Sequence, residues 1–306
     1  MSSEILIAPN RDDAIQVLGY KKSYGKVRAL RGINLQVQRG EIFGFLGPNG
    51  AGKTTTIRCL LDMIRPDEGK ALLMGVDPQR EPIAVQARTG YLPGEMQYYN
   101  NWSSERQLRF FNDLRGSRAE WNFVHQLAER LSLDLKQPIK NLSKGNKQKL
   151  GVIQAFMHRP ELLLLDEPTS GLDPLMQQEV LALLREANRG GATVFFSSHI
   201  MSEVENVAGR VAIIRSGEIV EIAETSSLTR RVLNRLTVRF KQPVDCSDLV
   251  ELPGVEIISQ ADHTSLILQV TGDMEKLVQA LGRLPVLDLE TEHPSLEEAF
   301  LTYYKN

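Results

Sequence analysis

The chain has 306 residues, of which 42% are hydrophobic and 24% are charged, and this is the composition of a globular protein with a large buried core. Its 36 Lys and Arg residues against 38 Asp and Glu residues give a formal charge of −2. That balance argues against a protein held to nucleic acid by a large basic surface.

Four short apolar runs in the first two-thirds of the chain are predicted to be strands buried on both faces. After the first run, apolar residues from Ile57 to Ile64 recur at helical spacing, which predicts a helix over residues 53–64. Residues 104–160 hold several helical patterns and few β runs, which predicts a helical insert. This alternation is typical of a layered α/β domain. The four runs are EIFGFLG from Glu41, ELLLLDE from Glu161, TVFFSSH from Thr193 and RVAIIRS from Arg210.

The pattern changes around Thr225, where TSSLTRR has the composition of a linker or a short helix, and residues 226–306 are predicted to form a small α+β domain. A helical pattern covers residues 273–283. Pro294 and Ser295 begin a last predicted helix, in which Ser295 and Glu298 form a capping box. The predicted strands of this domain are LTVRF, VEIIS, LILQV and VLDLE.

Residues 47–54, GPNGAGKT, match the P-loop pattern G-x-x-x-x-G-K-[ST] between a predicted strand and a predicted helix, the context in which this motif binds phosphate. Glycines let backbone N–H groups converge on the phosphates, and the helix N-terminus adds a favourable dipole. Lys53 would reach the β- and γ-phosphates, and the Thr54 hydroxyl would bind Mg²⁺. The alternative is a glycine-rich turn without a ligand. The predicted nucleotide-binding residues here are Gly47, Pro48, Asn49, Gly50, Ala51, Gly52, Lys53, Thr54 and Thr55.

The run LLLLDE ends a later predicted strand with two adjacent carboxylates. A P-loop needs a distant acid at a strand end to hold the Mg²⁺ shell, and Asp166 supplies it. Adjacent residues at a strand end point in different directions, so Glu167 can polarise an attacking water while Asp166 serves the metal. The alternative is a pair of acids that only terminate a strand. We predict Thr54 and Asp166 as metal ligands and Glu167 as the general base.

Taken in order, these motifs resemble the ATP-binding subunits of ABC transporters over about residues 15–225. The series is Tyr24, GPNGAGKTT, LSKGN, LLLLDEPTSGLDP and His199 in FSSHIMSEVE. The resemblance implies a P-loop NTPase core of the ABC type within residues 1–225, with a helical subdomain at about residues 95–160. Residues 226–306 are then a small α+β accessory domain, whose role could be structural or regulatory.

The basic run NLSKGNKQKL could be a solvated turn, a nucleic-acid patch or part of a catalytic surface. In ABC subunits an LSGGQ-like signature lies just before the acidic strand and opens a helix. The resemblance therefore implies that Ser143, Gly145 and Asn146 cap the γ-phosphate of ATP bound to a second subunit. A serine hydroxyl, a glycine N–H and a helix N-terminus suit an anion. Lys144 replaces the usual glycine and Asn146 the usual glutamine.

The resemblance also implies roles for three isolated residues. Tyr24 would stack on adenine, although a core or surface tyrosine is the alternative. Asp173 would lie in the loop that faces the other subunit. His199 would contact the γ-phosphate and orient the attacking water.

One position departs from the family pattern. ABC subunits usually carry glutamine where the core joins the helical subdomain, in a context like YLPQ, but this chain reads YLPGEMQYY with Gly94 in that place. Glycine has no side chain to bind Mg²⁺ or to sense the γ-phosphate. We hypothesise that Glu95, Gln97 or a water substitutes, and that Mg²⁺ is held less tightly than in relatives.

The resemblance implies an ATPase that uses ATP and Mg²⁺ and dimerises with a second copy or a similar ATPase. No apolar run approaches the roughly 18 residues that cross a bilayer, so transport requires a separate integral-membrane permease. The opening residues do not form a signal peptide and the two cysteines are far apart, which favours the cytoplasm. We expect peripheral attachment to the membrane through the permease and no nucleic-acid partner.

Within the family, YLPGE, LSKG and the ending SLEEAFLTYY look most like ABC-2-type exporter subunits. The competing class is a soluble ABC ATPase that acts in translation or on DNA. Translation-type members carry two cassettes and DNA-repair members a long coiled coil. This chain has one P-loop, and only 113 residues without sustained heptads separate Lys53 from Asp166. An importer ATPase is a third possibility, and the substrate stays open.

Overall fold

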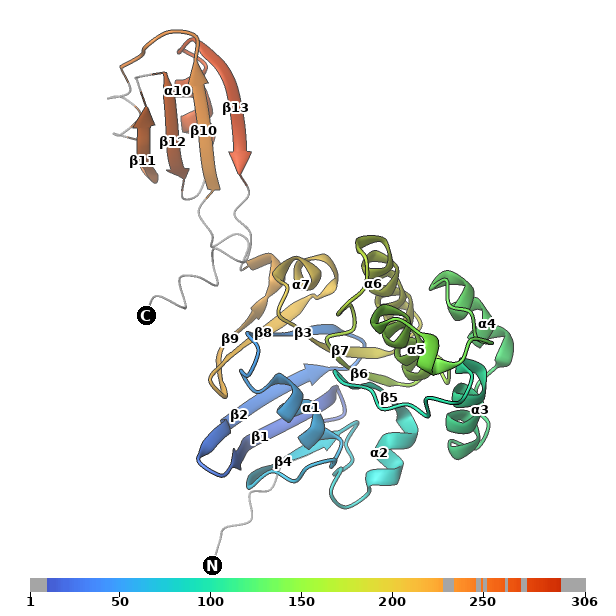
Figure 1. Ribbon diagram of the computed structural model, residues 1–306. Coiled ribbons are helices and arrows are strands. Elements are labelled where there is room, and N and C mark those ends of the chain that lie inside the picture. Colours follow the sequence, from blue (N-terminus) through green and yellow to red (C-terminus); the bar gives the residue numbers. More distant parts are fainter. Residues whose placement is uncertain are drawn as a thin grey trace, which may run out of the picture. The chain divides into compact units, whose positions relative to one another are not determined.

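The computed structural model describes residues 10–227, 234–245, 249, 252–261, 264–270 and 274–292 (Figure 1). The chain divides into two compact units, Met1–Thr225 and Ser226–Asn306. None of the helices in these described stretches is long and apolar enough to span a membrane.

A six-stranded sheet with strand order β5-β6-β7-β3-β8-β9 forms the centre of the first unit. Five strands are parallel, and β9 is antiparallel to β8. Every residue of β3, β6 and β7 is buried, which confirms the prediction from the continuous apolar runs. The carboxyl ends of the parallel strands therefore meet at one edge. The strands are β3 (Ile42–Leu46), β5 (Thr89–Leu92), β6 (Leu162–Asp166), β7 (Thr193–Ser198), β8 (Arg210–Arg215) and β9 (Glu218–Glu224).

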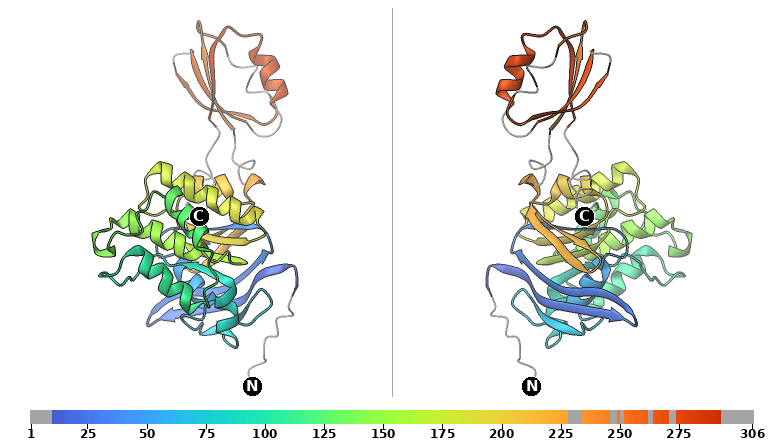
Figure 2. Two further views of the ribbon diagram at one scale, coloured as in Figure 1. Left: turned by 90° about the vertical axis from the view of Figure 1, so that its right-hand side faces the viewer. Right: turned by 90° about the vertical axis from the view of Figure 1, so that its left-hand side faces the viewer.

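A second, antiparallel sheet consists of β2 (Val27–Gln38), β1 (Asp13–Tyr24) and β4 (Glu68–Leu73), and it was not predicted. Helix α1 (Lys53–Leu60) lies between the two sheets (Figures 1 and 2). Ile57 and Leu60 of this helix are fully buried, because both belong to a core built from side chains of both sheets.

The predicted helix over residues 53–64 starts where expected but ends early. Leu60 is the last residue of α1, because Asp62 takes a left-handed conformation with φ of 51° that a right-handed helix cannot continue. Ile64 still packs against the same core. The apolar spacing after Leu60 therefore reflects burial rather than helix.

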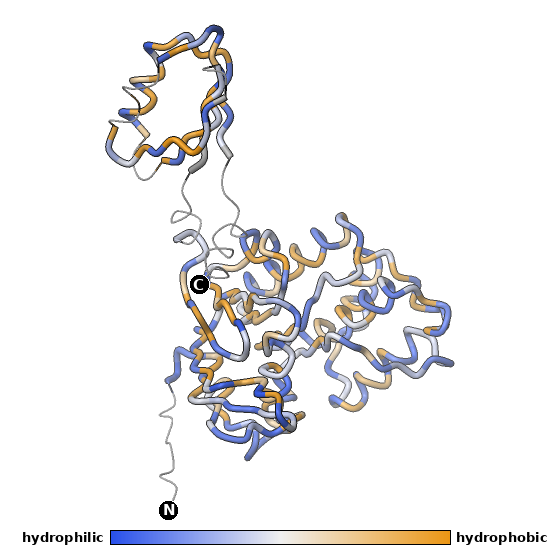
Figure 3. Tube along the Cα trace, turned by 60° about the vertical axis from the view of Figure 1, so that its left-hand side comes forward, coloured by the Kyte–Doolittle hydropathy of each residue, from blue (hydrophilic) through white to orange (hydrophobic). Residues whose placement is uncertain are grey.

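Three further helices pack against strands of the six-stranded sheet, and a separate helical layer follows β5 in the chain (Figure 1). Helices α3 and α5 begin at Ser103 and Ser143, whose hydroxyls accept a backbone N–H bond as N-caps. Hydrophobic and hydrophilic residues alternate along these helices (Figure 3). The helical layer holds α3 (Ser104–Leu114), α4 (Trp121–Arg130), the short η1 (Ile139–Asn141) and α5 (Lys144–Phe156), and the other helices are α2 (Pro82–Arg88), α6 (Pro174–Arg189) and α7 (Met201–Val207).

The second unit is an antiparallel sheet of order β11-β12-β10-β13 with helix α10 (Glu275–Leu281). The helix connects β12 to β13, and β10 lies between these two strands, as in a split βαβ unit. Leu236, Val238, Leu268 and Leu277 are in its core. The four predicted strands are confirmed, whereas the predicted last helix from Pro294 falls outside the described residues. The strands are β10 (Asn234–Phe240), β11 (Val255–Ala261), β12 (Ser265–Val270) and β13 (Val286–Glu292).

Candidate functional site

The glycine-rich turn between β3 and α1 can exist only with glycine at its tightest positions. A Cβ atom on Gly47 would lie 2.3 Å from the Ile214 carbonyl oxygen, and one on Gly52 would lie 2.8 Å from the Ala29 carbonyl oxygen. Gly52 also takes φ of 114°, and it starts α1 without a side-chain cap. The first N–H groups of α1 therefore face the turn without a side-chain partner, as an anion site requires.

Lys53 folds back over this turn. Its ammonium donates to the carbonyl oxygens of Gly47 at 2.7 Å and Pro48 at 3.2 Å, and the side chain is only 5% exposed. The same nitrogen lies 3.3 Å from Oε1 of Glu167. The positive charge is thus held at the mouth of the turn, beside the acidic strand end.

Asp166 ends β6 with both carboxylate oxygens engaged. Oδ2 accepts the Thr54 hydroxyl at 2.6 Å, and Oδ1 accepts the Ser197 hydroxyl at 2.6 Å. The residue is 1% exposed, so these two bonds fix its direction. A threonine hydroxyl and a carboxylate are hard oxygen donors of the kind Mg²⁺ prefers, and the two side chains fit that ion.

Glu167 turns the chain sharply after the strand. Its φ of 51° is left-handed, an uncommon conformation for a residue other than glycine. Its backbone N–H donates to the carbonyl and hydroxyl oxygens of Ser197, at 3.2 and 3.1 Å. The Glu167 carboxylate has different partners from that of Asp166, because its Oε1 lies 3.2 Å from Nδ1 of His199 and also contacts the Lys53 ammonium. His199 is 44% exposed, so this cluster opens to solvent.

The signature segment begins α5. The Ser143 hydroxyl accepts the Asn146 N–H at 3.1 Å, which leaves its own proton free to donate. Gly145 lies so close to the next loop that a Cβ atom would be 2.9 Å from the Gly171 carbonyl oxygen. Asp173 in that loop caps α6 by accepting the Met176 N–H at 3.0 Å.

Tyr24 is the last residue of β1 and is 48% exposed, so it is not a core residue. The Lys22 ammonium is 5.9 Å from the ring centroid. Stacking of this ring on adenine stays a prediction.

Several polar residues that support the site were not among the predicted residues. Gln148 donates from Nε2 to the carbonyl oxygens of Glu167 and Pro168, at 3.0 and 3.1 Å. Glu203, 6% exposed, accepts hydroxyl bonds from Ser198 at 2.6 Å and from Thr169. The two serines that end the run TVFFSS are the sequence feature that could have indicated Glu203, because a buried hydroxyl at a strand end needs a hydrogen-bond partner.

Gly94 lies directly on the carboxylate of Asp166, where a Cβ atom would be 3.0 Å from Oδ2. Glu95 and Gln97 are both exposed. Neither makes a hydrogen bond with Asp166 or Thr54 in the described part of the chain.

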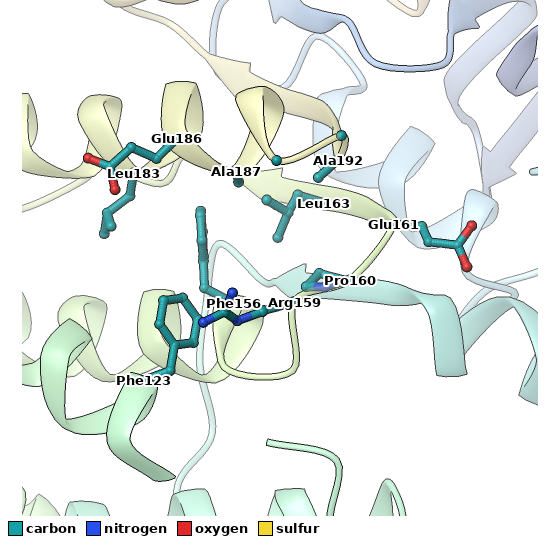
Figure 4. Close-up of a pocket in the computed structure, with 12 residues that line it drawn as sticks. Phe123, Phe156, Arg159, Pro160, Glu161, Leu163, Leu183, Glu186, Ala187 and Ala192 are labelled. Atoms are coloured by element: carbon teal, nitrogen blue, oxygen red, sulfur yellow. The ribbon is translucent and has the colours of Figure 1, made fainter. Parts of the chain in front are cut away.

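A cavity of about 380 Å³ lies where β6 begins, at the end of the strand opposite to Asp166. Figure 4 shows Phe123, Phe156 and Leu183 around it, from α4, α5 and α6. None of the residues predicted to bind nucleotide lines this cavity.

Known proteins resemble the chain over most of its length. The ABC transporter family profile matches residues 30–170. The linearmycin resistance ATP-binding protein LnrL of Bacillus subtilis is 30% identical over 94% of this chain and 97% of the relative. The bacitracin transport ATP-binding protein BcrA of Bacillus licheniformis is 33% identical over 94% and 96%. A dimeric ATP-binding cassette in a post-hydrolysis state with ADP and Pi shares the fold, with 20% identity, a TM-score of 0.61 and coverage of 69% of this chain and 98% of that one.

Proposed function

Because the chain belongs to the ATP-binding subunits of the ABC transporter family, we propose that it is the ATPase that powers an ABC-2-type exporter. Relatives of nearly the same length are named for resistance to linearmycin and for bacitracin transport, which supports export over import and over action in translation or on DNA. The partners are a second copy, or a similar ATPase, and a separate integral-membrane permease at the cytoplasmic face. Met1–Thr225 is the ATP-binding domain and Ser226–Asn306 an accessory domain.

The glycine-rich turn and Lys53 bind the phosphates of ATP. The turn supplies N–H groups at an uncapped helix start, and Lys53 supplies a positive charge that its carbonyl partners hold in place. Thr54 and Asp166 hold Mg²⁺, which neutralises charge on the phosphate oxygens when bound. Tyr24 offers an exposed ring to the adenine.

The observation that carries the catalytic assignment is the convergence of Lys53 and His199 on one carboxylate oxygen of Glu167. Glu167 accepts the proton of the water that attacks the γ-phosphate, so that ATP and water become ADP and phosphate. His199 holds that carboxylate and the water in line. Asp166 is hydrogen-bonded to Thr54 and Ser197 instead, so this neighbouring carboxylate is left to hold the metal.

The signature segment acts on the ATP of the partner subunit. The Ser143 hydroxyl keeps its proton available, and Gly145 and Asn146 follow at the start of α5. The dimeric state of the related cassette with ADP and Pi supports two such sites between two chains.

Gly94→Gln is expected to strengthen Mg²⁺ binding, because the new side chain starts 3.0 Å from Oδ2 of Asp166 and brings an amide oxygen to a site with few oxygen donors. The Mg²⁺ concentration for half-maximal ATP hydrolysis should fall several-fold. Titrating Mg²⁺ with both proteins checks this, and superimposable curves contradict it.

The transporter assignment is tested by purifying tagged chain from gently solubilised membranes of the native organism and identifying what co-purifies. We expect a polytopic membrane protein in stoichiometric amount. Ribosomal or DNA-associated proteins without a membrane partner would favour a soluble ABC ATPase instead.

A further inference from the structure

Helix α5 is held by the two loops that leave the carboxyl ends of β5 and β6. The β6 loop contacts its first two turns, through the bonds from Gln148 to the carbonyls of Glu167 and Pro168 and through the close approach of Gly145 to Gly171. This side of the helix is thereby fixed to the residues that follow the catalytic acids.

The β5 loop holds α5 at two further points. The Met96 side chain fills the space above Gly151, where a Cβ atom would lie 1.4 Å from its Cε and 2.3 Å from its Sδ. The Tyr98 hydroxyl donates to the Lys147 carbonyl oxygen at 2.7 Å and also contacts the Met96 sulfur. Lys147 and Gly151 are one helical turn apart, so both contacts fall on one face of α5.

The start of the same loop lies at the acidic strand end. Gly94 has no side chain, and its backbone passes against the carboxylate of Asp166. Five residues, 94–98, therefore connect Asp166 to the signature helix by packing and a hydrogen bond. The Met96 contact restricts the register of α5, because every residue of this helix other than its two glycines, Gly145 and Gly151, would bring a Cβ atom into the space that Gly151 leaves open.

We propose that residues 94–98 form a positioning strap that fixes α5, and with it Ser143 and Gly145, relative to Asp166. The strap presents the signature segment in the orientation that closes on the ATP of a second chain. This inference rests on the proposed ATP-dependent dimer. Met96 and Tyr98 are positioning residues, since they act through α5 and touch no reacting atom.

Tyr98→Phe tests the strap with a small change, because it removes one hydroxyl and keeps the ring. In a Glu167→Gln background, ATP-dependent dimerisation is measured by size exclusion over a range of protein concentrations. We expect the dimer dissociation constant to rise about fivefold, as for loss of one hydrogen bond. Equilibrium binding of ATP to the monomer should not change. Tyr99→Phe is the matched control, because Tyr99 is 52% exposed and no side-chain hydrogen bond is found for it in the described residues.

A double-mutant cycle tests the Met96–Gly151 contact. Gly151→Ala should weaken the dimer at least about tenfold when Met96 is present and less than about twofold in a Met96→Ala background, where the clash is gone. Three results would each overturn the strap. The first is an equal effect of Gly151→Ala on the dimer dissociation constant in both backgrounds, and the second is an equal effect of Tyr98→Phe and Tyr99→Phe on that constant. The third is a loss of ATP affinity in the monomer that matches the loss of dimer affinity. A Glu167→Gln parent that stays monomeric with ATP would contradict the proposed function as well.

Discussion

Glu167→Gln is expected to lower the ATP hydrolysis rate by at least about 100-fold, the usual contribution of a general base. ATP binding should persist, because the phosphate-binding turn, Lys53 and the Thr54–Asp166 pair are unchanged. Glutamine has nearly the same shape as glutamate, but its amide cannot take a proton from water. The variant should accumulate as an ATP-bound dimer, measured by size exclusion with and without ATP.

Glu161→Gln is the matched control for that experiment. Glu161 lies at the other end of the same strand, and its carboxylate pairs with Arg88 at 2.6 Å on the surface. Hydrolysis by this variant should equal that of the wild type. If Glu167→Gln hydrolysed ATP as fast as this control, the base would be another residue.

The sequence predicts the parts of this molecule that local chemistry dictates. The P-loop is recognisable because Gly47 and Gly52 meet backbone oxygens that exclude any Cβ atom, and no other residue type satisfies that geometry. The strands β3, β6 and β7 are buried on both faces, and the apolar runs IFGFL, LLLL and VFF within them reflect this burial. The family and fold predictions are confirmed by relatives that match nearly the whole chain.

Contacts between distant segments explain what the sequence does not predict. The antiparallel sheet of β1, β2 and β4 was not predicted, although Ile33, Leu35 and Val37 alternate with exposed polar residues along β2, which is the local pattern of a half-buried strand. The pairing of β4 with β1 joins segments about 50 residues apart and has no local signal. The support of Glu167 by Gln148 needs α5 to lie beside the β6 loop, a fact of packing alone. Likewise Gly151 gives no sign in the sequence that Met96 fills its missing side chain.

Mixing two inactive variants is expected to restore ATP hydrolysis if each site combines the P-loop of one chain with the signature of the other. Lys53→Ala removes the phosphate-binding charge. Ser143→Asp keeps an N-cap for α5 but places a negative charge against the γ-phosphate. Each variant alone should hydrolyse ATP about 100-fold more slowly than the wild type, because each lacks or repels a phosphate contact in both sites.

Random pairing of the two variants makes half of the dimers mixed, and each mixed dimer holds one intact site out of two, so activity should recover to at most about a quarter of the wild-type value. Different tags on the two chains show that mixed dimers form. Ser103→Asp is the matched control, because Ser103 caps α3 with the same geometry and lies outside the predicted site. Mixed dimers that form without any recovery would place Ser143 and Lys53 in the same site of one chain. Recovery would instead require that the Ser143 hydroxyl reach the phosphates held by the partner chain. In a mixed dimer the intact Lys53 belongs to the Ser143→Asp chain and the intact Ser143 to the Lys53→Ala chain, so a complete site must combine both chains.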